Sequence, residues 1–130
     1  MSLNDIPNAE FEKKATMHKK RFGHSALYFE CEGENPDQGK EDFVIVSGSR
    51  KRPSDDDNST SVEVYDAYKD NWYKCKKLKT GRHHHLTLTY KTVEKTYMYV
   101  IGGVNTSSFG VKNVERLDFG SLYIEYYMRG

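Results

Sequence analysis

Short apolar runs separated by polar, turn-forming residues divide this chain into segments of the length expected for β-strands. The first run spans residues 25–29 and alternates, so that Leu27 and Phe29 fall on one side of an extended chain and Tyr28 on the other. Further runs follow at residues 43–46, 62–66, 72–75, 97–101 and 114–118. Runs of this length bounded by turn residues predict an all-β fold.

Two of these runs are apolar without alternation. Residues 43–46 read Phe-Val-Ile-Val, and residues 97–101 read Tyr-Met-Tyr-Val-Ile. Continuous apolar runs of this length are typical of strands that are covered on both faces. We therefore expect both runs to lie inside a stack of sheets.

The series of strands occurs twice, and an internal repeat of this size determines the architecture. Each copy opens with an arginine that is followed, three residues later, by a histidine. An apolar run that ends in small residues comes next, then a strand that ends in aspartate, then a large apolar residue. The marks of the first copy are Arg21, His24, Ser47-Gly48, Tyr65-Asp66 and Trp72, and those of the second are Arg82, His85, Gly102-Gly103, Leu117-Asp118 and Ile124.

These marks resemble the kelch motif, and the resemblance covers nearly everything from Arg21 to the C-terminus. In that family a repeat of about fifty residues forms one four-stranded blade of a β-propeller. The first copy has Ser47-Gly48 where the family has two glycines, and the second has Ile124 in place of the tryptophan. The resemblance implies two four-stranded antiparallel kelch-type blades, at residues 21–81 and 82–130, in an incomplete propeller.

Two further expectations concern the segments around the repeats. Residues 1–20 form a leader outside the repeats, which could start a short helix after Pro7 or add an outer strand to a neighbouring blade. Trp72 is expected to pack between blades, where its replacement by alanine would cost about 3–5 kcal/mol. A small antiparallel sandwich with accidental self-similarity remains the alternative fold.

Two blades are too few for a closed ring, because propellers need about four to eight. A stack of two buries one shared face and leaves two outer faces bare. We therefore expect the chain to be part of a longer propeller, to assemble with further copies of itself, or to be covered by other proteins.

Composition limits the classes of partner. The net charge of +1 argues against a strong field directed at nucleic acid or membrane, and no apolar run is long enough to span a bilayer. The two cysteines, Cys31 and Cys75, have no metal-like spacing, and the polar N-terminus lacks a secretory signal. These features favour a reduced, cytoplasmic environment, and no cofactor is expected.

Two loops distinguish the copies from a minimal repeat. A polar segment from Cys31 to Glu41 separates the first two strands, and a basic cluster followed by an acidic one separates the next two. Such loops are solvated by default, but repeat proteins often place binding surfaces there. The candidate partner-binding residues are Arg50, Lys51, Arg52, Asp55, Asp56, Asp57, Asn105 and Phe109.

The histidines offer a weak metal hypothesis. In a strand, His83 and His85 would share a face, and His24 occupies the equivalent position in the other copy. Zinc requires three or four ligands, and this set is incomplete, so we favour polar residues near a channel mouth over a metal site. Arg21 and Arg82 could bind an anion, but at these positions we expect them to tie the first strand to neighbouring loops.

The sequence contains no nucleophile elbow and no phosphate-binding glycine loop. The primary hypothesis is therefore a non-catalytic protein–protein interaction module. The resemblance implies partners such as ubiquitin-ligase adaptors, cytoskeletal proteins or scaffolds. The alternatives are a structural subunit buried in a large complex, a part of a catalytic kelch propeller, and a nucleic-acid binder using the lysines near Trp72.

Overall fold

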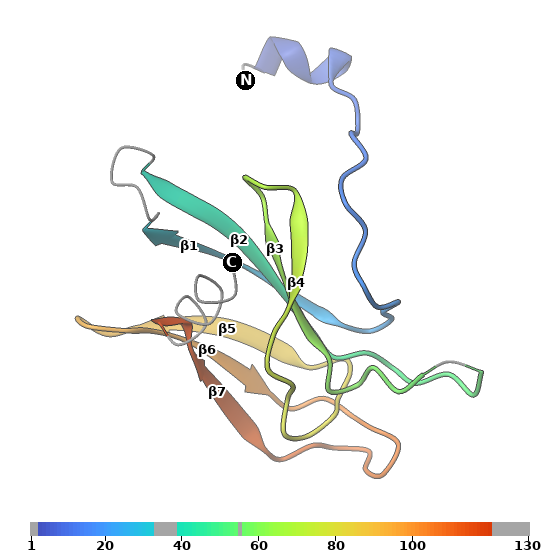
Figure 1. The fold of residues 1–130 in the computed structure, drawn as a ribbon. Coiled ribbons are helices and arrows are strands. Elements are labelled where there is room, and N and C mark those ends of the chain that lie inside the picture. The colour runs from blue at the N-terminus through green and yellow to red at the C-terminus, as the bar shows by residue number, and fades with distance from the viewer. Residues whose placement is uncertain (1–2, 33–38, 55, 121–130) are drawn as a thin grey trace.

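The computed structural model describes residues 3–32, 39–54 and 56–120. These residues form an all-β fold of two antiparallel sheets, as the sequence predicts (Figure 1). The first sheet has the order β1 (Ser25–Glu32), β2 (Lys40–Ser47), β3 (Val62–Asp66) and β4 (Asn71–Lys74), and the second has the order β5 (Leu86–Lys91), β6 (Thr96–Ile101) and β7 (Val114–Asp118). A fourth strand of the second sheet, expected near Ile124, lies outside the described residues.

The first hairpin is longer than the sequence pattern indicates. Strand β1 continues through Cys31, which pairs with Glu41, and β2 begins at Lys40. The expected loop from Cys31 to Glu41 was therefore wrong at both ends. Antiparallel pairing can hold polar residues at a sheet edge, so polarity alone did not mark the ends of these strands.

The strands of the two sheets are paired in the same register within each sheet, so each residue of one sheet has an equivalent in the other. Ser25 pairs with Ser47 in the first sheet, and Leu86 pairs with Ile101 in the second. Gly48 therefore corresponds to Gly102, and Ser49 to Gly103. The expectation that Ser47-Gly48 stands at the place of the glycine pair was wrong by one residue; the equivalent pair is Gly48-Ser49.

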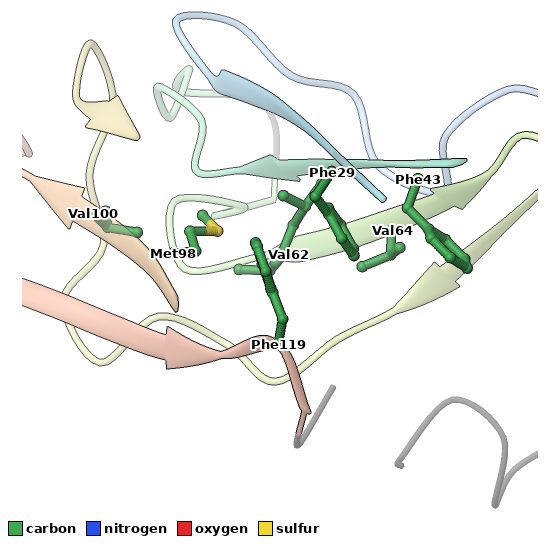
Figure 2. Close-up of a cluster of buried hydrophobic side chains, with 8 residues drawn as sticks. Phe29, Phe43, Val62, Val64, Met98, Val100 and Phe119 are labelled. Carbon is green, nitrogen blue, oxygen red and sulfur yellow. The ribbon is translucent and has the colours of Figure 1, made fainter. Parts of the chain in front are cut away.

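The hydrophobic core lies between the two sheets. Phe29, Phe43 and Ile45 of the first sheet are buried, and they pack in one cluster with Met98 and Val100 of the second. Figure 2 shows this cluster, in which the second sheet approaches the aromatic rings of the first. The alternation predicted in the first strand is confirmed, because Phe29 points into this core while Tyr28 is exposed.

The two central strands differ in how they are covered. In β2, Phe43, Ile45 and Val46 are all buried, so both faces of the strand are covered, as expected. In β6, Met98 and Val100 are buried while Tyr99 is half-buried. The expectation of two covered faces was therefore wrong for β6, since one of its faces has no neighbouring sheet among the described residues.

The leader has little regular structure. A 3₁₀ helix covers Leu3–Asn8, and the segment around Phe11 and Ala15 is neither helix nor strand. It runs past the edge of the first sheet, where the Ala15 N–H donates a hydrogen bond of 3.0 Å to Asp70 and the Trp72 indole donates one of 2.8 Å to the Ala15 carbonyl. Within the described part of the chain, no helix is long and apolar enough to cross a membrane.

Candidate functional site

A buried arginine anchors the start of the first sheet. Arg21 Nη1 donates to the carbonyl oxygens of Gly48 (3.0 Å) and Ser61 (2.8 Å), and its Nη2 lies 2.7 Å from Glu63 Oε2. The side chains of Arg21 and Glu63 are 0% and 1% exposed. The arginine therefore ties two loops to β3 rather than facing a solvent-borne anion.

The second sheet repeats this arrangement with equivalent residues. Arg82 Nη1 donates to the carbonyl oxygens of Gly102 (3.0 Å) and Asn113 (2.8 Å), and its Nη2 lies 2.9 Å from Glu115 Oε2. Repetition of the same four-part network at equivalent positions shows that the sequence repeat is also a structural one.

The glutamates of this network were missed by the sequence reasoning. Each carboxylate also accepts hydrogen bonds from two backbone N–H groups in the segment before its arginine. The donors are His18 and Lys19 for Glu63, and Lys79 and Thr80 for Glu115. The sequence did contain a signal, because both third strands have a glutamate at the same position. A position exposed to solvent would accept other polar residues as well.

The two aspartates at the ends of β3 and β7 hold the turns that follow. Asp66 Oδ1 accepts hydrogen bonds from the N–H groups of Tyr68 and Lys69, and Asp118 Oδ1 accepts one from Gly120. A short side chain that binds the backbone two residues further along is a standard turn-forming device. Asp66 and Asp118 are therefore structural.

Polar contacts join the two sheets at the start of β1 and β5 and at the end of β2. Ser47 Oγ and His85 Nε2 share a hydrogen bond of 2.9 Å, and the hydroxyls of Ser25 and Thr87 share another. Burial, followed by the nearby Arg82 charge, lowers the pKa of His85 from 6.5 to about 4. His85 therefore stays neutral at physiological pH and holds the second sheet to the first.

The histidine run does not form the strand that the metal hypothesis assumed. His84 has a left-handed backbone (φ 54°), which breaks the alternation, and its N–H donates to the Gly23 carbonyl. His83 forms an isolated bridge with Val104, whereas His85 faces Ser47. The His83 and His84 rings contact each other, with their Nδ1 atoms 2.7 Å apart, whereas the His85 ring is hydrogen-bonded to Ser47.

No group of three or more potential metal ligands occurs among the described residues. His24, the equivalent of His85, is exposed at the start of β1. Its pKa is lowered by partial burial and by the Arg21 charge. The structure therefore does not bring the three candidate histidines, His24, His83 and His85, together as a ligand set.

Gly48 and Gly102 mark the difference between the two sheets. Both have a left-handed φ, of 74° and 71°. A Cβ on Gly48 would lie 2.3 Å from the carbonyl oxygen of Arg82 in the second sheet, whereas a Cβ on Gly102 would meet no atom within 4 Å. The close approach made at Gly48 has no counterpart at Gly102 among the described residues.

One face of the second sheet has no sheet packed against it among the described residues. The register places alternate residues of β5, β6 and β7 on the side away from the first sheet. This open face consists of Leu86, Leu88, Tyr90, Tyr97, Tyr99, Ile101, Val114, Arg116 and Asp118. Tyr90 packs edge-on against Tyr99, and the Arg116 guanidinium lies 4.2 Å from the centre of the Tyr97 ring.

The open face corresponds to the face that the first sheet buries in the core. Phe29 is 6% exposed and its equivalent Tyr90 is 55% exposed. Val62 is 5% exposed and its equivalent Val114 is 56% exposed. Contiguous exposed apolar side chains are typical of interaction sites.

The candidate partner-binding residues belong to the loop between β2 and β3 and to the loop between β6 and β7, which both lie on the side of the molecule opposite the β5–β6 turn (Figure 1). Arg52 sits over the Phe22 ring, 5.5 Å from its centre, and Arg50 donates its N–H to the Phe22 carbonyl. Phe109 is fully exposed, while Asn105 donates to the Gly81 carbonyl and so has a structural contact.

The acidic residues of the loop between β2 and β3 are only partly free to contact a partner. Hydrogen bonds from the Ser59 side chain and then from the Ser59 N–H lower the pKa of Asp57, with a smaller contribution from the Lys51 charge. Asp56 is exposed, and Asp55 lies outside the described residues. The charges of this loop thus partly neutralise one another.

Trp72 does not lie between the two sheets. It pairs with Tyr65 across β3 and β4, and the two rings are 5.0 Å apart on the face away from the second sheet. The side chain is half-buried, with its indole N–H donating to the leader. The cost of about 3–5 kcal/mol expected for an interior tryptophan therefore does not apply.

A cavity of about 680 Å³ opens between the sheets and is lined by Phe29, Cys31, Thr89 and Phe119, among others. Burial, followed by the Glu41 charge, raises the pKa of the Cys31 thiol to about 11. A thiol that stays protonated at neutral pH is a poor nucleophile. The cavity thus contains no activated cysteine.

Comparison with known proteins gave no match: no family model, no curated protein and no solved structure is similar to this chain.

Proposed function

We propose that the chain is a non-catalytic protein–protein interaction module built from two kelch-type propeller blades. The repeated arginine–glutamate network and the matching registers support the view that the two sheets are copies of one unit. Each unit presents a face that needs a neighbour, and the second unit lacks one among the described residues.

The open face is the single observation that carries this proposal. Its residues occupy the positions that the first sheet uses to bury its core, yet Tyr90 and Val114 remain more than half exposed. Burying apolar surface contributes about 25 cal/mol per Å², so a partner that covers this face gains the same kind of stabilisation that joins the two sheets.

Differential capture of partners tests the proposal. Wild-type protein is compared with Leu88→Glu, which places a charge on the open face, and with Val93→Glu, which makes the same type of change in the exposed β5–β6 turn. We expect proteins that bind the wild type and Val93→Glu to be lost from Leu88→Glu. Equal binding by all three proteins would contradict the proposal.

A further inference from the structure

We propose that the open face of the second sheet docks the rear face of the first sheet in a second copy of this chain. This inference rests on the proposed function and names its partner. The rear face is the side of the first sheet that points away from the second sheet. Its exposed and half-buried residues include Ala26, Tyr28, Glu30, Asp42, Val44, Tyr65 and Trp72, whereas Val46 and Glu63 on the same side are buried.

The chain already contains one interface of this type. The core-facing side of the first sheet packs on the side of the second sheet that carries Met98 and Leu117. By register, Met98 corresponds to Val44 and Leu117 to Tyr65. Within one chain, the Met98 side of the second sheet covers the core-facing side of the first sheet. The rear face is equivalent to the Met98 side, and the open face is equivalent to the core-facing side.

The backbone of the second sheet has room for this neighbour. At the existing interface the Arg82 carbonyl approaches Gly48, and the Ser49 N–H donates to that same oxygen. The equivalent glycine, Gly102, has the same left-handed backbone and open space beside its Cα. The Arg21 carbonyl of a second copy is the equivalent group that would enter this space.

The side chains of the two exposed faces complement each other in charge. The open face carries the Arg116 guanidinium, at the position that Val64 occupies in the first sheet. It also carries Asp118, whose carboxylate forms an ion pair of 3.2 Å with Lys95. The rear face carries Asp42, which accepts a hydrogen bond of 2.6 Å from the Tyr28 hydroxyl, and Glu30, which lies 3.0 Å from the same hydroxyl and 3.6 Å from the Lys40 ammonium. Opposite charges on the two surfaces favour this pairing over contact between two like faces.

The open face differs from the core-facing side of the first sheet in ways that suit a surface exposed in the separate chain and covered in the assembly. Its aromatic side chains are tyrosines where the first sheet has buried apolar residues. Tyr90, Tyr97 and Tyr99 stand at the positions of Phe29, Phe43 and Ile45. A tyrosine provides apolar area while its hydroxyl remains hydrated, so the separate chain tolerates exposure of this face.

The proposed contact is heterologous, because two different surfaces meet. A heterologous interface breaks when either surface is altered in every copy, and it re-forms between copies that carry different alterations. The test therefore uses two variants, Leu88→Glu on the open face and Ala26→Glu on the rear face, both at exposed strand positions.

The molar mass of each protein is measured by light scattering over a range of concentrations. We expect the wild type and the control Val93→Glu to exceed the mass of one chain as concentration rises, and each face variant alone to stay at one chain. An equimolar mixture of Leu88→Glu and Ala26→Glu should return to the mass of two chains and no higher, because one intact pair of faces remains.

Circular dichroism in the near ultraviolet checks that both variants retain the native fold, and Gly102→Ala supplies a second, uncharged alteration of the open face that should also lower the mass. A wild type that has the mass of one chain at every concentration overturns the inference. A mixture that stays at one chain overturns it as well. In either of these two outcomes, the capture experiment separates the two proposals. If Leu88→Glu fails to capture proteins that the wild type captures, the proposed function stands without self-association. If Leu88→Glu captures the same proteins as the wild type, the proposed function and the inference are both wrong.

Discussion

The two sheets of this protein use the same internal framework but face different surroundings. In both, a buried arginine bridges two carbonyl groups and a glutamate, and an aspartate holds the turn after the third strand. In the first sheet, the face containing Phe29 is buried against the second sheet, whereas the equivalent face containing Tyr90 is open. The comparison separates the contacts that hold the strands of one sheet together from the contacts that cover the apolar face of that sheet.

The contacts within each sheet are polar and specific, while the contact between sheets is mainly apolar. The arginine network satisfies backbone groups that would otherwise be buried without partners, and such unpaired groups cost about 1–3 kcal/mol each. The apolar face is not satisfied within its own sheet. It requires another surface, and the first sheet finds one in the second.

The largest expected effect comes from breaking the framework. Arg21→Ala leaves the Glu63 carboxylate buried without its cation, and Arg82→Ala does the same to Glu115. Removing one partner of a buried pair costs about 3–5 kcal/mol, so both variants should lose that much in the free energy of unfolding in urea.

The matched control for this prediction is Lys40→Ala, which breaks an exposed ion pair with Glu30 and should cost less than about 1 kcal/mol. A loss at Arg21 as small as the loss at Lys40 would show that the buried network does not hold the first sheet together.

The next effect separates the covered face from the open one. Ile45→Ala removes a side chain with no exposed surface from the core and should cost about 2–5 kcal/mol. Tyr99→Ala, at the equivalent position on the open face, should cost about 1 kcal/mol or less in dilute protein, because little packing is lost. Equal losses in urea unfolding would mean that the open face is in fact covered.

The equivalent glycines provide a smaller and more local comparison. Alanine at Gly48 or Gly102 must adopt a left-handed backbone, which costs about 1–2 kcal/mol at either position. Gly48→Ala should lose more than Gly102→Ala, because its Cβ must also move the Arg82 carbonyl away. Thermal unfolding of the two variants at low concentration provides the measurement, and a larger loss at Gly102 would contradict the assigned interface.

The last comparison concerns pH. Because the pKa of His85 falls from 6.5 to about 4 on folding, the unfolded chain binds a proton more readily than the folded chain between these values. The stability that neutral His85 contributes is fully present above about pH 6.5 and is lost as the pH falls toward 4.

The His85→Asn variant isolates this contribution from other titrating groups. The difference in unfolding midpoint between wild type and variant should shrink between pH 7 and pH 4.5. A difference that stays constant over this range would show that His85 does not lose its proton on folding.

Much of this fold was predictable from the sequence, because strand periodicity and the repeat both leave local marks. Alternation around Leu27 and Phe29 identified the core-facing side of β1, and the paired aspartates, Asp66 and Asp118, fixed the ends of the third strands. The glycine alignment failed by one residue, since serine and glycine both fit the loop and only the strand register decides between them.

Two features of the candidate site were not predicted from the sequence. Glu63 resembles any polar residue of an alternating strand, so its burial depends on Arg21, which lies far away in the chain. The open face has tyrosines at three positions where the covered face has apolar residues, but tyrosines are also common in interfaces, so this difference does not reveal which face is exposed. The sequence therefore indicates which sheet faces are apolar enough to pack against another surface, but not which of these faces is exposed in the folded chain.

The most direct test of this account is hydroxyl-radical footprinting of equivalent side chains in dilute and in concentrated protein. The account predicts that Phe29 and Phe43 are protected at every concentration, whereas Tyr90 and Leu88 react rapidly in dilute protein and become protected as concentration rises. Equal protection of Phe29 and Tyr90 in dilute protein would contradict the difference between the two sheets, and a concentration-independent reaction of Tyr90 would contradict docking of a second copy.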